Sequence, residues 1–204
     1  MAWKDLTAKT FASIRELKGI SLRTQEEHYE LYKGYIGKTN EIQKKLDTVD
    51  RSTANQIFSD LRSLRVDLSF AIGGVKNHEL FFGHLGGNGG KPGPKVAEQI
   101  ARDFPSYDAW LADFKASGLA ARGWVWLAYD HDLGMLTTVV GDAQNTFPLW
   151  NATPVLAMDV YEHAYWLDYG RLRAKYLEAF FENLDWGVVE RNLEGALAMH
   201  PAAR

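Results

Sequence analysis

The sequence contains no cysteine, so disulfides, thiolate metal sites and a cysteine nucleophile are all excluded. A strong charge of either sign is also missing. The 23 Lys and Arg residues face 26 Asp and Glu residues, which gives a formal net charge of −3. This balance offers no electrostatic footprint for nucleic acid or for an anionic membrane, and we expect neither as a partner.

Long apolar runs are missing as well. No run approaches the roughly 20 residues that a membrane-spanning helix requires. The N-terminal stretch M-A-W-K-D-L-T-A-K-T-F carries charges where a signal peptide would need an apolar core. We therefore expect a soluble, cytoplasmic protein.

The sequence is instead rich in the residues that build a core. Hydrophobic residues make up 46% and aromatic residues 13% of the 204 residues, and seven are tryptophan. A chain of this length and composition is typical of a globular protein with one domain or two small lobes.

Two long segments with helical periodicity occupy the first half of the chain. The first is expected to begin at Thr24, an N-cap whose capping box Glu27 completes, and to run to about Leu46. The second is expected to begin at Asp50–Ser52 and to run to about Leu85. Its apolar residues recur at steps of three and four: Ile57, Leu61, Leu64, Leu68 and Ile72. The two segments predict an antiparallel α-hairpin.

The second half begins after the densest cluster of helix breakers, G-G-N-G-G-K-P-G-P at Gly86–Pro94. Two shorter helical segments follow, and then the period changes. The stretches W-V-W-L-A-Y-D and M-L-T-T-V-V flank a D-L-G turn and predict a β-hairpin, and V-L-A-M-D-V is a third expected strand. Helical periodicity returns from Ala164 onward.

These patterns together predict an α+β fold. A long N-terminal antiparallel α-hairpin is followed by a C-terminal α/β lobe with a three-stranded antiparallel sheet. The breaker cluster divides the chain into an expected helical hairpin domain at residues 1–88 and a mixed α/β domain at residues 89–204.

Histidines are the residues that most directly point to chemistry. A single histidine is more often a satisfied structural residue than a ligand. We expect the histidine in the β-hairpin turn and the one in the C-terminal tail to be solvated, and His84 to cap the second helix. The six histidines are His28, His78, His84, His131, His163 and His200.

Three of these histidines and one carboxylate form a plausible ligand set. His28 and His78 lie on the two long helices near aromatic-rich faces, so they can converge. Asp159 ends a strand expected to be buried, where an unpaired carboxylate would be costly, and His163 follows four residues later. Three imidazoles and one carboxylate suit Fe or Mn and do not exclude Zn. A non-haem iron oxygenase is disfavoured, because that site uses two histidines and one carboxylate.

The sequence motifs around these residues resemble those of the iron/manganese superoxide dismutases. The stretch D-V-Y-E-H-A-Y-W-L-D-Y from Asp159 resembles the family signature D-V-W-E-H-A-Y-Y. N-H-E-L-F-F-G-H-L at Asn77–Leu85 resembles the second-ligand segment, and G-W-V-W-L at Gly123–Leu127 resembles the first strand. Y-L-E-A-F-F-E-N-L-D-W resembles the C-terminal helix. The resemblance extends, in order, over essentially the whole chain after about Ile20.

The resemblance implies a superoxide dismutase that disproportionates superoxide to dioxygen and hydrogen peroxide at one Mn or Fe ion per subunit. It also implies the four metal ligands, His28, His78, Asp159 and His163. A catalytically weak or inactive metal-binding relative with a structural or partner-binding role is the alternative. Retention of all four ligands favours the enzyme.

The resemblance extends to residues around the ligands. It implies that Glu162 bonds a ligand histidine of a second subunit, and hence a homodimer, and that Trp124 is a wall of the site. Iron-type members supply a solvent-binding glutamine where this chain has Gly74, whereas manganese-type members supply it from the sheet. Gln144 is the candidate for that role, with Asn145 as the alternative register, so the pattern favours manganese.

Several positions depart from the family pattern. Tyr32 replaces a histidine four residues after the first ligand, and Trp166 replaces a tyrosine that bonds to that histidine across the dimer. We interpret this pair as a rebuilt dimer gateway. Tyr161 replaces a tryptophan. Tyr35 falls seven residues after His28, where the family has its gateway tyrosine at eight. Tyr35 would keep the gateway role if this helix lacks a π-bulge that the family's helix contains.

Overall fold

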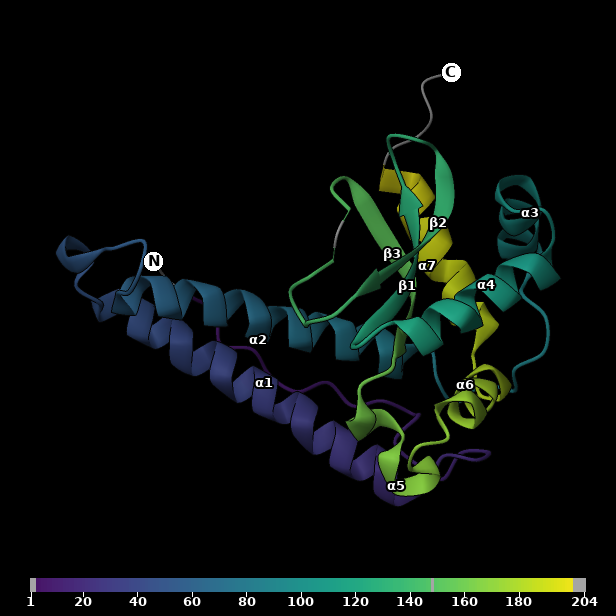
Figure 1. The fold of residues 1–204 in the computed structure, drawn as a ribbon, viewed down its shortest axis with the longest axis horizontal. Coiled ribbons are helices and arrows are strands. Elements are labelled where there is room, and N and C mark those ends of the chain that lie inside the picture. Colours follow the sequence, from purple (N-terminus) through teal and green to yellow (C-terminus); the bar gives the residue numbers. More distant parts are fainter. Residues whose placement is uncertain (1–2, 148, 200–204) are drawn as a thin grey trace.

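The computed structural model describes residues 3–147 and 149–199. Two long helices, α1 (Leu22–Thr48) and α2 (Asp60–Gly83), form an antiparallel hairpin that extends away from the rest of the molecule (Figure 1). The predicted α-hairpin is therefore confirmed.

Side chains of the hydroxyl-bearing residues before each helix set the starts of the hairpin helices. The Ser21 side chain accepts a hydrogen bond from the Thr24 N–H at 3.2 Å, so Ser21 is the N-cap of α1. The expected N-cap at Thr24 is wrong by one turn. Ser59 caps α2 in the same way by accepting from the Arg62 N–H at 3.3 Å.

The second helix begins later than its sequence indicates. Asp50 accepts a hydrogen bond from the Ser52 N–H at 2.9 Å and closes a single 3-10 turn, η1 (Arg51–Thr53). The chain then runs without helix until Asp60. The predicted start at residues 50–52 is wrong, because only one 3-10 turn forms there and α2 begins at Asp60, after the Ser59 cap.

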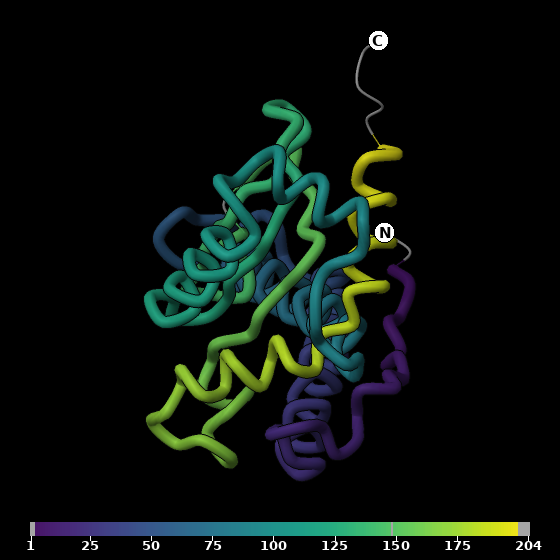
Figure 2. The backbone as a smooth tube through the Cα atoms, turned by 90° about the vertical axis from the view of Figure 1, so that its right-hand side faces the viewer, coloured from purple at the N-terminus to yellow at the C-terminus, as the bar shows by residue number. Residues whose placement is uncertain are grey.

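The second half contains the predicted three-stranded antiparallel sheet. Its strand order is β2-β1-β3, and both pairings are antiparallel. Helices α2 and α7 pack against β3, and α3 and α4 pack against β2 (Figures 1 and 2). The elements are α3 (Pro94–Asp103), α4 (Tyr107–Ala120), β1 (Trp124–Asp130), β2 (Met135–Gly141), β3 (Ala152–Asp159), η2 (Glu162–Ala164), α5 (Trp166–Tyr169), α6 (Arg173–Glu182) and α7 (Trp186–Met199).

The helical periodicity after Ala164 is divided among several elements. Gly170 adopts φ +49°, a left-handed conformation that ends α5 and lets the chain turn into α6. No helix within residues 3–147 and 149–199 is both long enough and apolar enough to cross a membrane.

One hydrophobic core joins the hairpin to the C-terminal lobe. Tyr32 and Phe81 of the hairpin are buried in the same cluster as Trp124, Leu156 and Phe180 of the lobe. The division into domains at residue 88 stays a prediction. The shared core holds α2 against β3, and α1 contacts η2, so the candidate site lies at this junction.

Candidate metal centre

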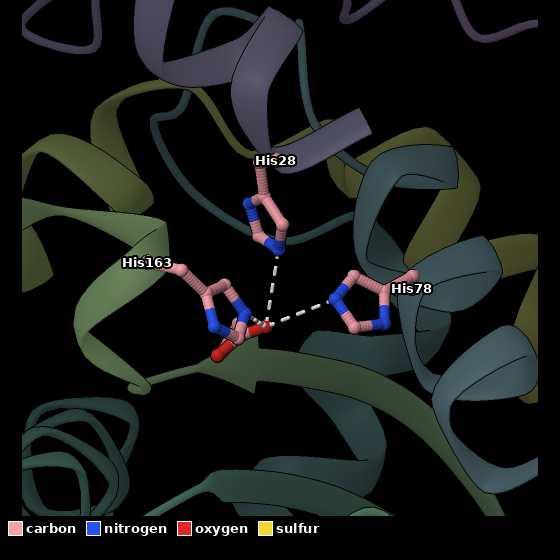
Figure 3. Close-up of side chains that lie close together, drawn as sticks. His28, His78 and His163 are labelled. Carbon is pink, nitrogen blue, oxygen red and sulfur yellow. Dashed lines mark hydrogen bonds and ion pairs between the residues drawn. The ribbon is translucent and has the colours of Figure 1, made fainter. Parts of the chain in front are cut away.

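Four side chains that are far apart in the sequence converge between the hairpin and the sheet. His28 comes from α1, His78 from α2, Asp159 from the end of β3 and His163 from η2. Their ligand-type atoms all lie within 4.8 Å of one another. Figure 3 shows the three imidazoles directed toward the same carboxylate oxygen.

The distances define the centre of the cluster. Asp159 Oδ2 lies 3.2 Å from His28 Nε2, 3.1 Å from His163 Nε2 and 3.6 Å from His78 Nε2. His28, His78 and Asp159 are buried, whereas His163 is partly exposed. The structure thus brings together every residue that the sequence proposed as a ligand.

Hydrogen bonds outside the cluster orient two of these side chains. His78 Nδ1 lies 2.6 Å from the Gly74 carbonyl oxygen, so Nδ1 carries the proton and the lone pair of Nε2 faces the cluster. Asp159 Oδ1 accepts a hydrogen bond from the Tyr161 N–H at 2.9 Å, which leaves Oδ2 for the cluster.

The electrostatics favour neutral imidazoles at His28 and His78 beside an ionised Asp159 carboxylate. Burial lowers the pKa of His78 to about 3, with the neighbouring His28 contributing, and burial also lowers the pKa of His28. Burial raises the pKa of Asp159, but its interactions with His163 and His28 outweigh this and hold the pKa below its usual range.

The donor set fits a metal ion. His78 Nε2 is buried and has no hydrogen-bond partner among the described residues, although it faces three other ligand-type atoms. A buried polar atom of this kind is costly unless something binds it. Imidazole nitrogens with one carboxylate suit first-row transition metals such as Fe and Mn.

The residues proposed to surround the ligands also lie at the cluster. Gln144 is buried. Its Oε1 accepts from the Trp124 indole N–H at 3.1 Å, and its Nε2 donates to the Tyr35 hydroxyl at 3.3 Å. The ring centroids of Trp124 and Tyr35 each lie 5.3 Å from the ring centroid of His78. Asn145, the alternative to Gln144, is exposed and bonds to Ser69 instead.

Tyr35 reaches the cluster because α1 is a regular α-helix over its whole length. Seven residues at about 100° each return to nearly the angular position of His28, whereas eight residues would overshoot by about 80°. Tyr35 therefore lies close to the angular position of His28 without a π-bulge, whereas Ile36 is rotated away by about 80° and packs in the core.

Gly74 leaves space for the Tyr35 ring. A Cβ atom at Gly74 would lie 2.7 Å from the Cγ and Cδ1 atoms of Tyr35, closer than van der Waals contact permits. In this chain the tyrosine ring thus fills the space into which a side chain at position 74 would extend.

The interpretation of Tyr32 as half of a rebuilt gateway is wrong. Its side chain is fully buried, and its hydroxyl donates to Glu79 at 2.9 Å and accepts from the Lys9 N–H at 3.1 Å. Leu31 instead lines a groove together with Trp166, Glu162 and His163. Helical periodicity was the signal that could have identified Leu31.

Tyr161 keeps an aromatic wall beside the cluster. Its ring is stacked on the His163 ring, with centroids 5.3 Å apart and planes 17° apart. Its hydroxyl donates to the Asp142 carbonyl oxygen at 3.2 Å, and burial raises its pKa to about 12.

His84 and His131 lie away from the cluster. His84 is at the C-cap of α2 as expected, but it is fully buried and accepts a hydrogen bond from the Ala157 N–H at 3.0 Å. His131, expected to be solvated, is partly buried and lies 2.8 Å from the Thr153 hydroxyl. His200 lies outside the described residues.

Comparison with known proteins identifies the family of this chain. The family model of the iron/manganese superoxide dismutases, C-terminal domain, matches residues 92–192. A superoxide dismutase (Fe) of Aquifex pyrophilus is 40% identical over 209 residues, which cover 100% of this chain and 98% of that protein. A superoxide dismutase (Fe) of Aquifex aeolicus is 40% identical over 93% of this chain and 92% of its own length. A superoxide dismutase (Mn) of Haloferax volcanii is 36% identical over 82% of this chain and 83% of its own length. The chain belongs to the iron/manganese superoxide dismutase family.

Proposed function

We propose that this protein is a superoxide dismutase whose single Mn or Fe ion is held by His28, His78, Asp159 and His163. The observation that carries the proposal is the convergence of three imidazole nitrogens on one buried carboxylate oxygen, with His78 Nε2 lacking a hydrogen-bond partner in the part of the chain that the structure describes. When bound, the ion supplies one-electron redox chemistry between its +3 and +2 states, which lets one superoxide be oxidised to dioxygen and the next be reduced to peroxide.

The reaction also needs protons, since two superoxide anions and two protons give one dioxygen and one hydrogen peroxide. The hydrogen-bonded pair of Gln144 and Tyr35 lies beside His78 and can hold a proton at the Tyr35 hydroxyl. Burial, with the charge of Asp159, raises the pKa of Tyr35, so this phenol stays protonated at neutral pH. Trp124 and Tyr161 exclude bulk water from two sides of the cluster.

The residues around the cluster favour manganese over iron. The amide that faces the cluster comes from Gln144 in the segment after β2, and the Tyr35 ring excludes a glutamine from position 74. This arrangement corresponds to the manganese-type pattern, in which the sheet supplies the glutamine and position 74 is a glycine. It tunes the redox potential of the site and does not by itself select the ion that loads.

A homodimer is the second part of the proposal. Among the described residues, His163 Nδ1 has no hydrogen-bond partner, although ligand histidines normally donate this proton to a carboxylate or carbonyl. Glu162 is exposed beside it, and the neighbouring Leu31, Trp166 and Leu167 are also exposed. A second copy placed over this face would bring its Glu162 to His163 and cover the apolar side chains. A cytoplasmic location stays a prediction.

The experiment that tests the function measures metal content and superoxide turnover together. Protein purified under defined Fe or Mn supply should contain one ion per chain and should catalyse superoxide decay. His78→Ala should lose both, whereas the matched variant His131→Gln, outside the cluster, should keep both. Stoichiometric metal without turnover would instead support the inactive relative.

A further inference from the structure

The outer edge of strand β3 is bonded by side chains rather than by another strand. In the order β2-β1-β3, β1 is the single strand within residues 3–147 and 149–199 that pairs with β3. The residues of β3 from Val155 to Asp159 are buried, so their outward N–H and C=O groups need partners other than water.

Three side chains from three helices supply these partners. Asn192 of α7 donates to the Val155 carbonyl oxygen at 3.0 Å. His84 at the end of α2 accepts from the Ala157 N–H at 3.0 Å. Tyr176 of α6 donates to the Asp159 carbonyl oxygen at 2.7 Å. These bonds occur at steps of two along β3, as expected for one edge of a strand.

Of these three, His84 alone follows directly on a helix that carries a proposed ligand. It lies six residues after His78 at the C-cap of α2, and the residue it bonds lies two before Asp159. The bond therefore links the helix of one proposed ligand to the strand of another. Both ends are buried and neither can exchange its partner for water.

We propose that His84 is a positioning residue of the metal centre, which holds β3 at Ala157 and so fixes the Asp159 carboxylate against His78. This inference rests on the proposed function, since it takes His78 and Asp159 as ligands. Small displacements of a ligand are costly in a metal site, because the affinity depends on the geometry of the whole set.

The surroundings of His84 keep it suited to this role. Its ring is edge-on to Phe180 at 5.8 Å and to Phe81 at 6.2 Å, and Phe81 packs 5.1 Å from the His28 ring. Its backbone carbonyl accepts from the Asp185 N–H at 2.7 Å. Burial lowers the pKa of His84 to about 3, so Nε2 remains an acceptor at neutral pH.

The proposal is tested by replacing His84 with two amide side chains, Gln and Asn, that differ by one methylene group in length. The oxygen of His84→Gln can extend about as far as the imidazole Nε2, whereas the oxygen of His84→Asn is one carbon short. The matched control is Asn192→Leu, which removes the bond to the same edge at Val155 from a helix without a proposed ligand. The probe is Mn(II) alone, titrated into the metal-free full-length protein, with amide hydrogen exchange at Ala157 as a second readout.

We expect His84→Asn to weaken Mn(II) binding by about 10-fold or more and to speed exchange at Ala157, in line with other residues that support metal ligands. His84→Gln should restore both readouts to near the wild-type values. Asn192→Leu should lower thermal stability but leave Mn(II) affinity unchanged. Equal Mn(II) affinity in the Asn, Gln and wild-type proteins would overturn the proposal, as would a loss of affinity that Gln does not restore.

If His84→Asn does not fold, the proposal can still be tested on the wild-type protein. A scalar coupling between the Ala157 amide nitrogen and His84 Nε2 should be observed by NMR both without metal and with diamagnetic Zn(II), and its absence overturns the proposal. The two claims fail separately. Wild-type protein that binds Mn(II) without superoxide turnover contradicts the proposed function, whereas unchanged Mn(II) affinity in His84→Asn contradicts only the role of His84.

Discussion

At the scale of residues, the site depends on three imidazoles and one carboxylate whose ligand-type atoms all lie within 4.8 Å of one another. His28, His78, Asp159 and His163 were singled out by residue type and by the words around them, and the structure brings their ligand-type atoms together. His84 was expected only to cap a helix. Its bond to Ala157 depends on how α2 meets β3, and no local pattern encodes that contact.

Gly74 provides a prediction at the residue scale. Gly74→Ala should destabilise the protein by about 1–3 kcal/mol, because the new Cβ overlaps the Tyr35 ring. The displaced ring should also weaken the bond between Tyr35 and Gln144 and lower superoxide turnover. Gly37→Ala, on the same hairpin with open space at its Cβ position, should stabilise it by up to about 1 kcal/mol. Denaturant unfolding of both variants measures the contrast, and equal effects would contradict it.

The buried histidines predict how stability depends on pH in the metal-free protein. The pKa of His78 is lowered from 6.5 to about 3 in the folded state, and that of His28 is also lowered. As the pH decreases below about 6.5, these two histidines therefore bind protons in the unfolded chain but stay neutral in the folded chain. Stability should be complete above about pH 6.5 and should fall as the pH decreases toward 3, by about 1.4 kcal/mol per pH unit for His78, with His28 contributing in the same direction.

Denaturant unfolding of the metal-free protein at several pH values measures this slope. The matched variant His78→Gln lacks one of the titrating groups and should show a shallower dependence. A profile that stays flat between about pH 6.5 and 4.5 would contradict neutral, buried imidazoles in the folded state.

At the scale of elements, helical periodicity predicted the type of each segment better than its ends. Ile57 was counted in the apolar face of the second helix, yet it lies before that helix and is 84% exposed. The Asp50 side chain closes a 3-10 turn, and the next helix begins only where Ser59 can cap it. Such competition between local hydrogen bonds is not visible in a period of 3.6 residues.

The regularity of α1 gives a prediction at this scale. One alanine inserted between Leu31 and Tyr32 would rotate the buried Tyr32 and the site residue Tyr35 by about 100° relative to His28. The insertion should cost about 3 kcal/mol or more, as for loss of a large core side chain, and should weaken Mn(II) binding. The same insertion after Gln56, in the exposed connection before α2, should change stability little. Thermal unfolding and Mn(II) titration compare the two, and a regular helix is contradicted if both insertions are tolerated alike.

At the scale of the whole molecule, the fold class followed from the change of hydrophobic period after the glycine-rich segment at residues 86–94. The order of the strands and the packing of α2 against β3 did not follow from it. These are contacts between distant segments, so their position is set by the shared core rather than by local sequence.

The proposed homodimer can be tested on its apolar face. Trp166 is 51% exposed beside Glu162 and His163, so Trp166→Glu should place a charge in the interface and raise the dimer dissociation constant at least about tenfold. Trp150 is 93% exposed in the segment before β3, and Trp150→Glu should leave association unchanged. Sedimentation velocity measures both. A wild-type protein that sediments as a monomer at micromolar concentration would contradict the dimer.

The most direct test of the central claim is the rate of superoxide decay per bound metal ion, with free metal removed by a chelator. We predict one Mn or Fe ion per chain and a second-order rate constant on the order of 10⁸–10⁹ M⁻¹s⁻¹, near the diffusional limit. A protein that carries its metal on His28, His78, Asp159 and His163 but reacts no faster than the free aqueous ion would contradict the account.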